Sequence, residues 1–230
     1  MNDPDVAARA AAAAAGAQLV SPGMTVGLGS GRAVWKVVEL LAEREELLGG
    51  GITAVAASSR TDELIRAAGI EVAELDGSLE VDLVLDGADE VDPSLRLIKG
   101  GGGALLREKV VVSAARRFVV VAQIRKRVER LGEGFRLPVE VVRFAWRETR
   151  RRVGELLPDP TLRLREDGES YVTDEGHFIL DSTLPADTDL ESLDRALKQL
   201  PGVVEHGLFI GLAERALLGR PDGSVEVLEG

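Results

Sequence analysis

The chain has 230 residues, and its 28 Lys and Arg residues against 39 Asp and Glu residues give a formal net charge of −11. A content of 45% hydrophobic and 29% charged residues is typical of globular proteins and excludes a disordered or fibrous chain. The chain has no cysteine, only two histidines, no apolar run near the roughly 20 residues of a membrane helix, and an acidic start over residues 1–5. We therefore expect a cytoplasmic protein with no metal site and no nucleic-acid or membrane partner.

Strand and helix patterns alternate through the first half of the chain. We expect strands over residues 25–28, 52–57, 72–75, 81–85 and 118–122, and helices over residues 6–19, 33–48, 61–68 and 104–115. The alanine run at residues 10–15 is expected to form the first turns of an exposed helix. Alternation of this kind, with glycine loops at strand ends, predicts a Rossmann-like parallel sheet with helices on both faces.

The pattern changes after residues 132–134. We expect strands over residues 139–144, 161–165, 177–181 and 203–210, and helices over residues 147–157 and 190–200. The order β-α-β-β-α-β is typical of a ferredoxin-like unit, and residues 224–228 are expected to add an edge strand to the first sheet. We predict an α/β catalytic domain of residues 1–134 and 208–230, and a smaller α+β (ferredoxin-like) domain of residues 135–207.

A glycine loop at residues 29–31, which we call the first glycine loop, follows the strand expected at residues 25–28. Its backbone N–H groups and the dipole of the next helix suit a phosphate. The chain does not match the dinucleotide-binding fingerprint G-x-G-x-x-G. Arg32 stands where the last glycine of the fingerprint is needed, and residues 58–59 are serines where the fingerprint needs an acidic residue. The loop therefore favours phosphate over a nicotinamide cofactor, and a plain packing turn is the alternative.

Two acids follow the strand expected at residues 81–85. Asp86 and Asp89 fall at its carboxyl end, where open parallel sheets bind ligands, on a turn that Gly87 makes possible. Carboxylates there can hold sugar hydroxyls or move protons. A solvated acidic turn and helix capping are the alternatives.

Four consecutive glycines at residues 100–103, which we call the second glycine loop, separate Lys99 from the next helix. Such a run is costly in chain entropy and suits close approach to a ligand. Glu108 lies about one turn into the helix, and because helical side chains lean toward the N-terminus its carboxylate can face the ligand end of the sheet. An ordinary exposed glutamate is the alternative.

A third group of charges, residues 125–127, follows the strand expected at residues 118–122. An acidic protein that binds an anion needs local cations, and Lys126 is a candidate phosphate partner. A solvated charge cluster is the alternative. His177 and His206 are expected to be structural.

The motifs at residues 86–90 and 99–109 closely resemble those of the ribose-5-phosphate isomerase A family. Further matches extend over nearly the full chain, at residues 26–31, 137–141, 172–176, 179–181, 201–204 and 207–209. The resemblance implies interconversion of D-ribose 5-phosphate and D-ribulose 5-phosphate in the pentose phosphate pathway, with no metal or organic cofactor. It also implies a sheet domain with a smaller α+β domain, and homo-oligomers that are commonly dimers.

The resemblance also assigns roles to residues of this chain. It implies that Glu108 is the general base, that Asp86 and Asp89 contact the sugar, and that Lys99 is the active-site lysine. The substrate-binding positions that it implies, or that the matched motifs include, are Ser30, Gly31, Arg32, Ala33, Gly87, Ala88, Gly100, Gly101, Gly102 and Lys126.

The first glycine loop departs from the family pattern of glycine-threonine-glycine-serine-threonine, because Arg32 and Ala33 replace two hydroxyl residues. We hypothesise that Arg32 supplies a charge-assisted phosphate contact instead. The departure leaves a non-catalytic sugar-phosphate sensor as one alternative function. An amino-sugar phosphate deaminase or a coenzyme A transferase is another, although the acid pair, Lys99 and Glu108 favour the isomerase.

Overall fold

The computed structural model describes residues 4–230, so most of the acidic start predicted at residues 1–5 lies outside the described residues. Within that range the largest sheet has seven strands, in the order β14-β13-β7-β4-β1-β2-β3. Neighbouring strands are parallel except for the outermost pair, β13 and β14. The strands are β1 (Thr25–Leu28), β2 (Thr53–Ala56), β3 (Glu71–Val72), β4 (Leu83–Asp86), β7 (Phe118–Gln123), β13 (Arg215–Gly219) and β14 (Val225–Glu229).

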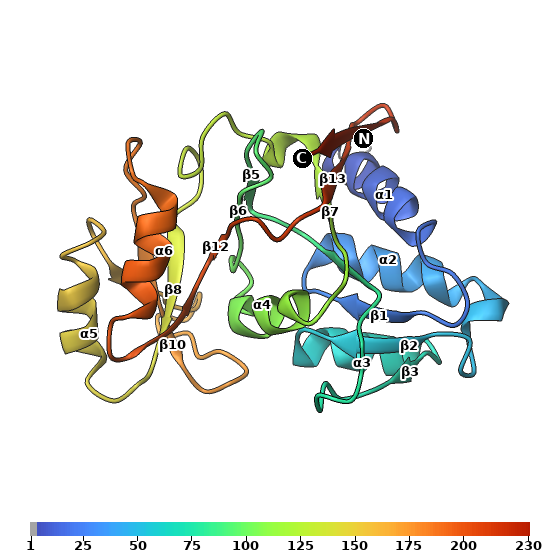
Figure 1. The fold of residues 1–230 in the computed structure, drawn as a ribbon, viewed down its shortest axis with the longest axis horizontal. Helices are drawn as coiled ribbons and strands as arrows, with labels where there is room; N and C mark the ends of the chain where they lie inside the picture. The colour runs from blue at the N-terminus through green and yellow to red at the C-terminus, as the bar shows by residue number, and fades with distance from the viewer. Residues whose placement is uncertain (1–3) are drawn as a thin grey trace.

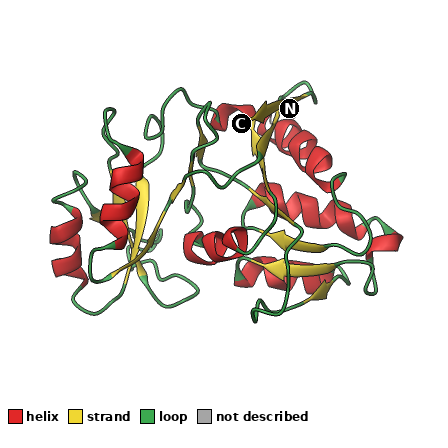
Figure 2. Cartoon of the chain, viewed as in Figure 1, coloured by secondary structure: helices red, strands yellow, loops and turns green. Residues whose placement is uncertain are grey.

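Helices cover both faces of this sheet. One core joins apolar strand residues to three helices, α1 (Pro4–Ala17), α2 (Arg32–Ala42) and α3 (Ser59–Ala67). A second core, on the other face, includes Val111 and Val112 of α4 (Leu105–Ser113). The predicted α/β sheet with helices on both faces is confirmed, and Figure 2 shows its helices in red and its strands in yellow.

The prediction of an exposed alanine helix is wrong. Ala12 and Ala13 have no exposed surface, and α1 packs against α2, β7 and β13. Small side chains allow this close approach: a Cβ at Gly219 would lie 1.8 Å from the Ala8 carbonyl oxygen. The alanine-rich face of α1 therefore packs closely against the large sheet.

A smaller four-stranded antiparallel sheet lies within residues 137–206, which we call the α+β region. Its strand order is β11-β8-β10-β9, and its connections give the predicted order β-α-β-β-α-β. Its elements are β8 (Leu137–Val141), α5 (Trp146–Val153), β9 (Thr161–Leu162), β10 (Phe178–Ser182), α6 (Leu190–Lys198) and β11 (Val203–His206). Figure 1 shows this region beside the large sheet. The domain boundaries after residues 134 and 207 stay a prediction.

Two segments differ from expectation, and the second of them bears on the site. The helix expected over residues 33–48 ends at Ala42 and gives way to a short 3₁₀ turn, η1 (Glu45–Leu47). The strand expected over residues 203–210 is broken at Gly207, where a Cβ would lie 2.2 Å from the Lys99 carbonyl oxygen. Its second half, β12 (Leu208–Phe209), joins a separate sheet.

That third sheet has the order β12-β6-β5 and links the two larger ones. Its other strands, β5 (Glu90–Val91) and β6 (Leu97–Ile98), were not predicted. Because β6 ends at Ile98, the sheet delivers Lys99 and the second glycine loop to the carboxyl end of the large sheet. None of the helices described is both long and apolar enough to cross a bilayer.

Candidate active site

A cavity of about 490 Å³ lies at the carboxyl ends of β1, β4 and β7. The chain runs outward in opposite directions from β1 and β4, so this is the switch point at which open α/β sheets bind ligands. The cavity is lined by every predicted site residue except Asp86, namely Ser30, Gly31, Arg32, Ala33, Gly87, Ala88, Asp89, Lys99, Gly100, Gly101, Gly102, Glu108 and Lys126. Segments far apart in the sequence thus meet in one place.

Lys99 is the centre of the charged cluster. Its Nζ donates to the Gly87 carbonyl oxygen at 2.7 Å, and it lies 2.8 Å from Asp86 Oδ2 and 3.3 Å from Glu108 Oε2. The side chain is only 3% exposed and stands over the Phe209 ring. Burial alone would lower the pKa of Lys99, but the two carboxylates raise it above its usual range, so the ammonium stays charged.

Asp86 is fully buried beneath Lys99 and does not line the cavity. Its Oδ1 accepts hydrogen bonds from the backbone N–H groups of Ser30, at 3.1 Å, and of Gly87, at 2.7 Å. The first glycine loop folds onto this carboxylate so closely that a Cβ at Gly29 would lie 1.8 Å from Asp86 Cγ. The geometry therefore gives Asp86 contacts with Lys99 and the loop backbone.

Glu108 lies in the first turn of α4 and is 5% exposed, so it is not an ordinary exposed glutamate. Its Oε2 faces the Lys99 ammonium at 3.3 Å. Burial raises the pKa of Glu108 to about 8, with a further contribution from Asp86, while Lys99 acts in the opposite direction. Burial also raises the pKa of Asp86, and because both carboxylates face Lys99 they titrate as a pair.

Asp89 is the acid of the predicted pair that reaches the cavity. Its Oδ2 accepts a hydrogen bond from the Gly101 N–H at 2.7 Å, and its Oδ1 lies 3.7 Å from Lys126 Nζ. A Cβ at Gly101 would lie 2.7 Å from Asp89 Oδ1, which explains glycine at that position. Asp89 thus joins the turn after β4 to the second glycine loop.

The first glycine loop begins α2 and forms another wall. Gly31 has a φ of 102°, which favours glycine, and is the N-cap of the helix. Arg32 is exposed and forms no ion pair with any residue in the described range. The N-terminal N–H groups of α2 and a free guanidinium therefore face the same cavity.

Sequence reasoning missed several lining residues. Arg9 of α1, Trp35 of α2 and Gln123 of β7 border the cavity, as does Arg125, which was seen only as part of a basic run. Arg9 carries no local signal, because a single arginine in an alanine-rich helix reaches the site only through the packing of α1. Together the arginines and lysines make a cationic cavity on an acidic protein.

A buried carboxylate beside a charged lysine, at the switch point of a Rossmann-like sheet, defines an α/β enzyme. The family model described as ribose 5-phosphate isomerase A (phosphoriboisomerase A) matches residues 53–223. The chain belongs to the ribose 5-phosphate isomerase A family, a family of isomerases, as its motifs predicted.

Individual relatives agree. Ribose-5-phosphate isomerase A of Roseiflexus castenholzii is 47% identical over 212 residues, which cover 90% of this chain and 89% of that protein. The protein of the same name from Thermomicrobium roseum is 45% identical over 223 residues, with 96% and 93% covered.

Solved structures give the same result. Ribose 5-phosphate isomerase A from Methanocaldococcus jannaschii superposes with a TM-score of 0.90 at 32% identity, covering 96% of this chain and 98% of that one. A D-ribose-5-phosphate isomerase in complex with phospho-erythronic acid gives a TM-score of 0.92 at 32% identity, with full coverage of both chains. The deaminase, transferase and sensor alternatives are therefore set aside.

Proposed function

We propose that this chain interconverts D-ribose 5-phosphate and D-ribulose 5-phosphate through an enediolate, with Glu108 as the general base. The observation that carries the proposal is the Glu108 carboxylate: it is nearly buried, borders the cavity, and has its Oε2 3.3 Å from the ammonium of Lys99. A raised pKa makes it a stronger base than an exposed glutamate, close to the operating pH.

The proton balance requires one base that serves two neighbouring carbons. In the open-chain aldose, Glu108 takes the proton from C2, the electron pair of that C–H bond forms the C1–C2 double bond, and the C1 carbonyl oxygen gains the negative charge. A proton then moves from the C2 hydroxyl to the C1 oxygen, and Glu108 returns its proton to C1. The product is the ketose, and the carboxylate is regenerated.

The charge that develops on the sugar oxygens needs donors already in place. Lys99 suits this role because its two carboxylate neighbours keep it protonated. The N–H groups of the second glycine loop border the same cavity. Lys99 Nζ lies 3.3 Å from Glu108 Oε2. This short distance supports a mechanism in which Glu108 acts as the base and Lys99 stabilises the developing charge on adjacent atoms of one substrate.

The two acids then take different roles. Asp89 borders the cavity, so we assign it to the sugar hydroxyls and to opening of the furanose ring. Asp86 is fully buried and bonded to Lys99 and the first glycine loop, so we assign it to holding those groups in place. This assignment replaces the direct sugar contact that the family resemblance implied for Asp86.

The phosphate is assigned to the start of α2, where backbone N–H groups, the Ser30 hydroxyl and Arg32 meet. Lys126 and Arg9, which also line the cavity, add positive charge. Assembly as a homodimer or higher homo-oligomer, and catalysis without metal or organic cofactor, remain predictions from the resemblance.

A direct assay of ribulose 5-phosphate formation from ribose 5-phosphate tests the proposal. We expect the wild-type chain to be active and Glu108→Gln to lose about 10²–10⁴-fold in kcat while KM changes little. Glu63→Gln, on the exposed face of α3, is the matched control and should leave both constants unchanged. Near-normal turnover by Glu108→Gln would remove Glu108 from the mechanism.

A further inference from the structure

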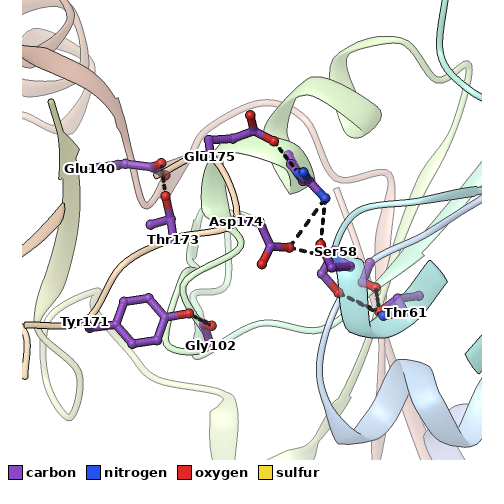
Figure 3. A network of polar contacts seen from close by, with 11 residues as sticks. Ser58, Thr61, Gly102, Glu140, Tyr171, Thr173, Asp174 and Glu175 are labelled. Atoms are coloured by element: carbon purple, nitrogen blue, oxygen red, sulfur yellow. Dashed lines mark hydrogen bonds and ion pairs between the residues drawn. The ribbon is translucent and has the colours of Figure 1, made fainter. Parts of the chain in front are cut away.

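The carbonyl groups of the second glycine loop are held by two side chains of the α+β region. Arg163 Nη1 donates to the carbonyl oxygens of Gly100, at 2.7 Å, and Gly101, at 3.1 Å. The Tyr171 hydroxyl donates to the Gly102 carbonyl oxygen at 2.9 Å, as Figure 3 shows. Three successive carbonyls of the loop are therefore fixed by side chains of the α+β region.

Both side chains are themselves held in place. The Arg163 guanidinium forms a two-point ion pair with Asp181, with N···O distances of 2.8 and 2.5 Å, and lies 5.9 Å from the centre of the Tyr171 ring. The Tyr171 ring presses on Gly103, where a Cβ would lie 2.2 Å from the phenolic oxygen. Glycine at position 103 is what lets the ring approach the loop.

The segment that carries Tyr171 is also anchored on helices α3 and α4. Asp174 Oδ2 accepts a hydrogen bond from the Ser59 N–H at the start of α3, at 2.8 Å. Glu175 pairs with Arg107 at 2.5 Å, and Arg107 directly precedes Glu108 in α4. Figure 3 shows residues 171–175 running from Gly102 to α3. The same short segment therefore contacts both the second glycine loop, through Tyr171, and the helix that carries Glu108, through Glu175.

Holding the carbonyls decides where the N–H groups point. In a trans peptide the C=O and the following N–H point in opposite directions, and the described chain has no cis peptide bond. Because Arg163 binds the Gly101 carbonyl, the Gly102 N–H is directed away from Arg163. Gly102 borders the cavity, and its N–H has no hydrogen-bond partner within residues 4–230. The preceding N–H, of Gly101, is bound by Asp89.

We propose that Arg163 and Tyr171 are positioning residues for the isomerisation, which aim the Gly102 N–H at the sugar oxygen that gains charge in the enediolate. This inference rests on the proposed function. Without the two side chains, a run of four glycines would sample many backbone conformations. Removal of one oxyanion-hole donor typically costs about 10²–10³-fold in kcat, and a displacement of about 1 Å can cost about 10²-fold.

Two variants test the proposal through a split between kcat and KM. Arg163→Met removes the guanidinium but keeps an unbranched side chain, and we expect kcat to fall about 10–100-fold with KM changed less than about threefold. Tyr171→Phe removes one hydroxyl and should lower kcat about 3–10-fold. Arg163→Lys should not restore kcat, because a single ammonium cannot hold both carbonyls and Asp181 in the planar geometry of a guanidinium.

The matched control is Arg136→Met. Arg136 also donates to backbone carbonyls within the α+β region, those of Asp159 and Asp181, but does not touch the second glycine loop. It should lose a similar amount of thermal stability while kcat stays within twofold of wild type. Affinity for phospho-erythronic acid, whose carboxylate places two oxygens at the reacting end, should fall in parallel with kcat in Arg163→Met and stay constant in Arg136→Met.

The outcomes separate this inference from the proposed function. An active wild type together with Arg163→Met and Tyr171→Phe at wild-type kcat overturns the inference alone, and so does an equal loss of kcat in Arg136→Met. Should Arg163→Met fail to fold, Tyr171→Phe decides by itself, since it deletes a single oxygen atom. A folded wild-type chain without isomerase activity overturns the proposed function.

Discussion

Replacing Asp86 by Asn should move the pH dependence of catalysis to lower pH. Asp86 raises the pKa of Glu108 by its charge, and it competes with Glu108 for the ammonium of Lys99. The amide keeps the shape of the side chain and one acceptor oxygen for the backbone of the first glycine loop. Glu108 then faces Lys99 without a second negative charge, so its carboxylate becomes easier to ionise.

The magnitude follows from the geometry. The two carboxylate oxygens lie 2.8 and 3.3 Å from the same lysine nitrogen, so they are no more than about 6 Å apart. At about 6 Å and an effective dielectric constant of about 20, the repulsion between unit charges is about 3 kcal/mol, or about 2 pKa units. Because Asp86 and Glu108 share their titration, we expect a shift of about 1–2 units, from about 8 in the wild type toward about 6–7.

The assay is the pH profile of kcat/KM, which reports the free enzyme. In the wild type we expect kcat/KM to rise with pH up to about 8 and then to level off, because Glu108 must be ionised to accept the proton. Asp62→Asn, at an exposed ion pair of α3, is the control and should leave the acidic limb in place for the same substrate. An acidic limb that stays put in Asp86→Asn, or moves to higher pH, would refute this coupling between the two carboxylates.

Three further outcomes are expected. Arg32→Ala should raise KM for ribose 5-phosphate about 3–30-fold at low salt, and less at high salt, with kcat little changed; an unchanged KM at fixed salt removes Arg32 from phosphate binding. Isomerisation should continue at the same rate after treatment with a metal chelator, because the proposed mechanism assigns the developing charge to Lys99 and backbone N–H groups; loss of activity that added metal restores would contradict it. Glu108→Gln should raise Tm at pH 8.5 by roughly 2–8 °C, measured by calorimetry. The reason is that an acid whose pKa rises from 4.5 to about 8 on folding makes the protein less stable as pH increases through that window; an equal or lower Tm would show that burial of the charge is not costly.

The sequence predicted the large sheet well, because strands such as β1, β4 and β7 are buried on both faces and show as apolar runs. It missed β13 of that sheet and both β5 and β6. The strands β5 and β6 have two residues each and exist only through pairing with one another and with β12. The break at Gly207 has the same origin, since it is caused by contact with the Lys99 carbonyl, over a hundred positions away in the chain. The pattern of neighbouring residues in the sequence does not reveal contacts between distant parts of the chain.

The candidate site divides in a similar way. Residue types at strand ends predicted that Asp89, Lys99 and Glu108 would share one crevice, because parallel strands end at a common edge. Nothing local distinguished Asp86 from Asp89, although one is fully buried and the other borders the cavity. Arg163 was also beyond prediction, because its role depends on how the α+β region packs against the second glycine loop.

Deuterium incorporation tests the central role of Glu108 most directly. With the wild-type chain in ²H₂O, we expect ribulose 5-phosphate to acquire deuterium at C1, as a base that exchanges its proton with solvent would produce. Glu108→Gln should bind ribose 5-phosphate, yet its turnover and its exchange of the C2 hydrogen should both fall about 10²–10⁴-fold. Exchange at the wild-type rate in that variant would mean that another group removes the proton, and Glu108 would then not be the general base.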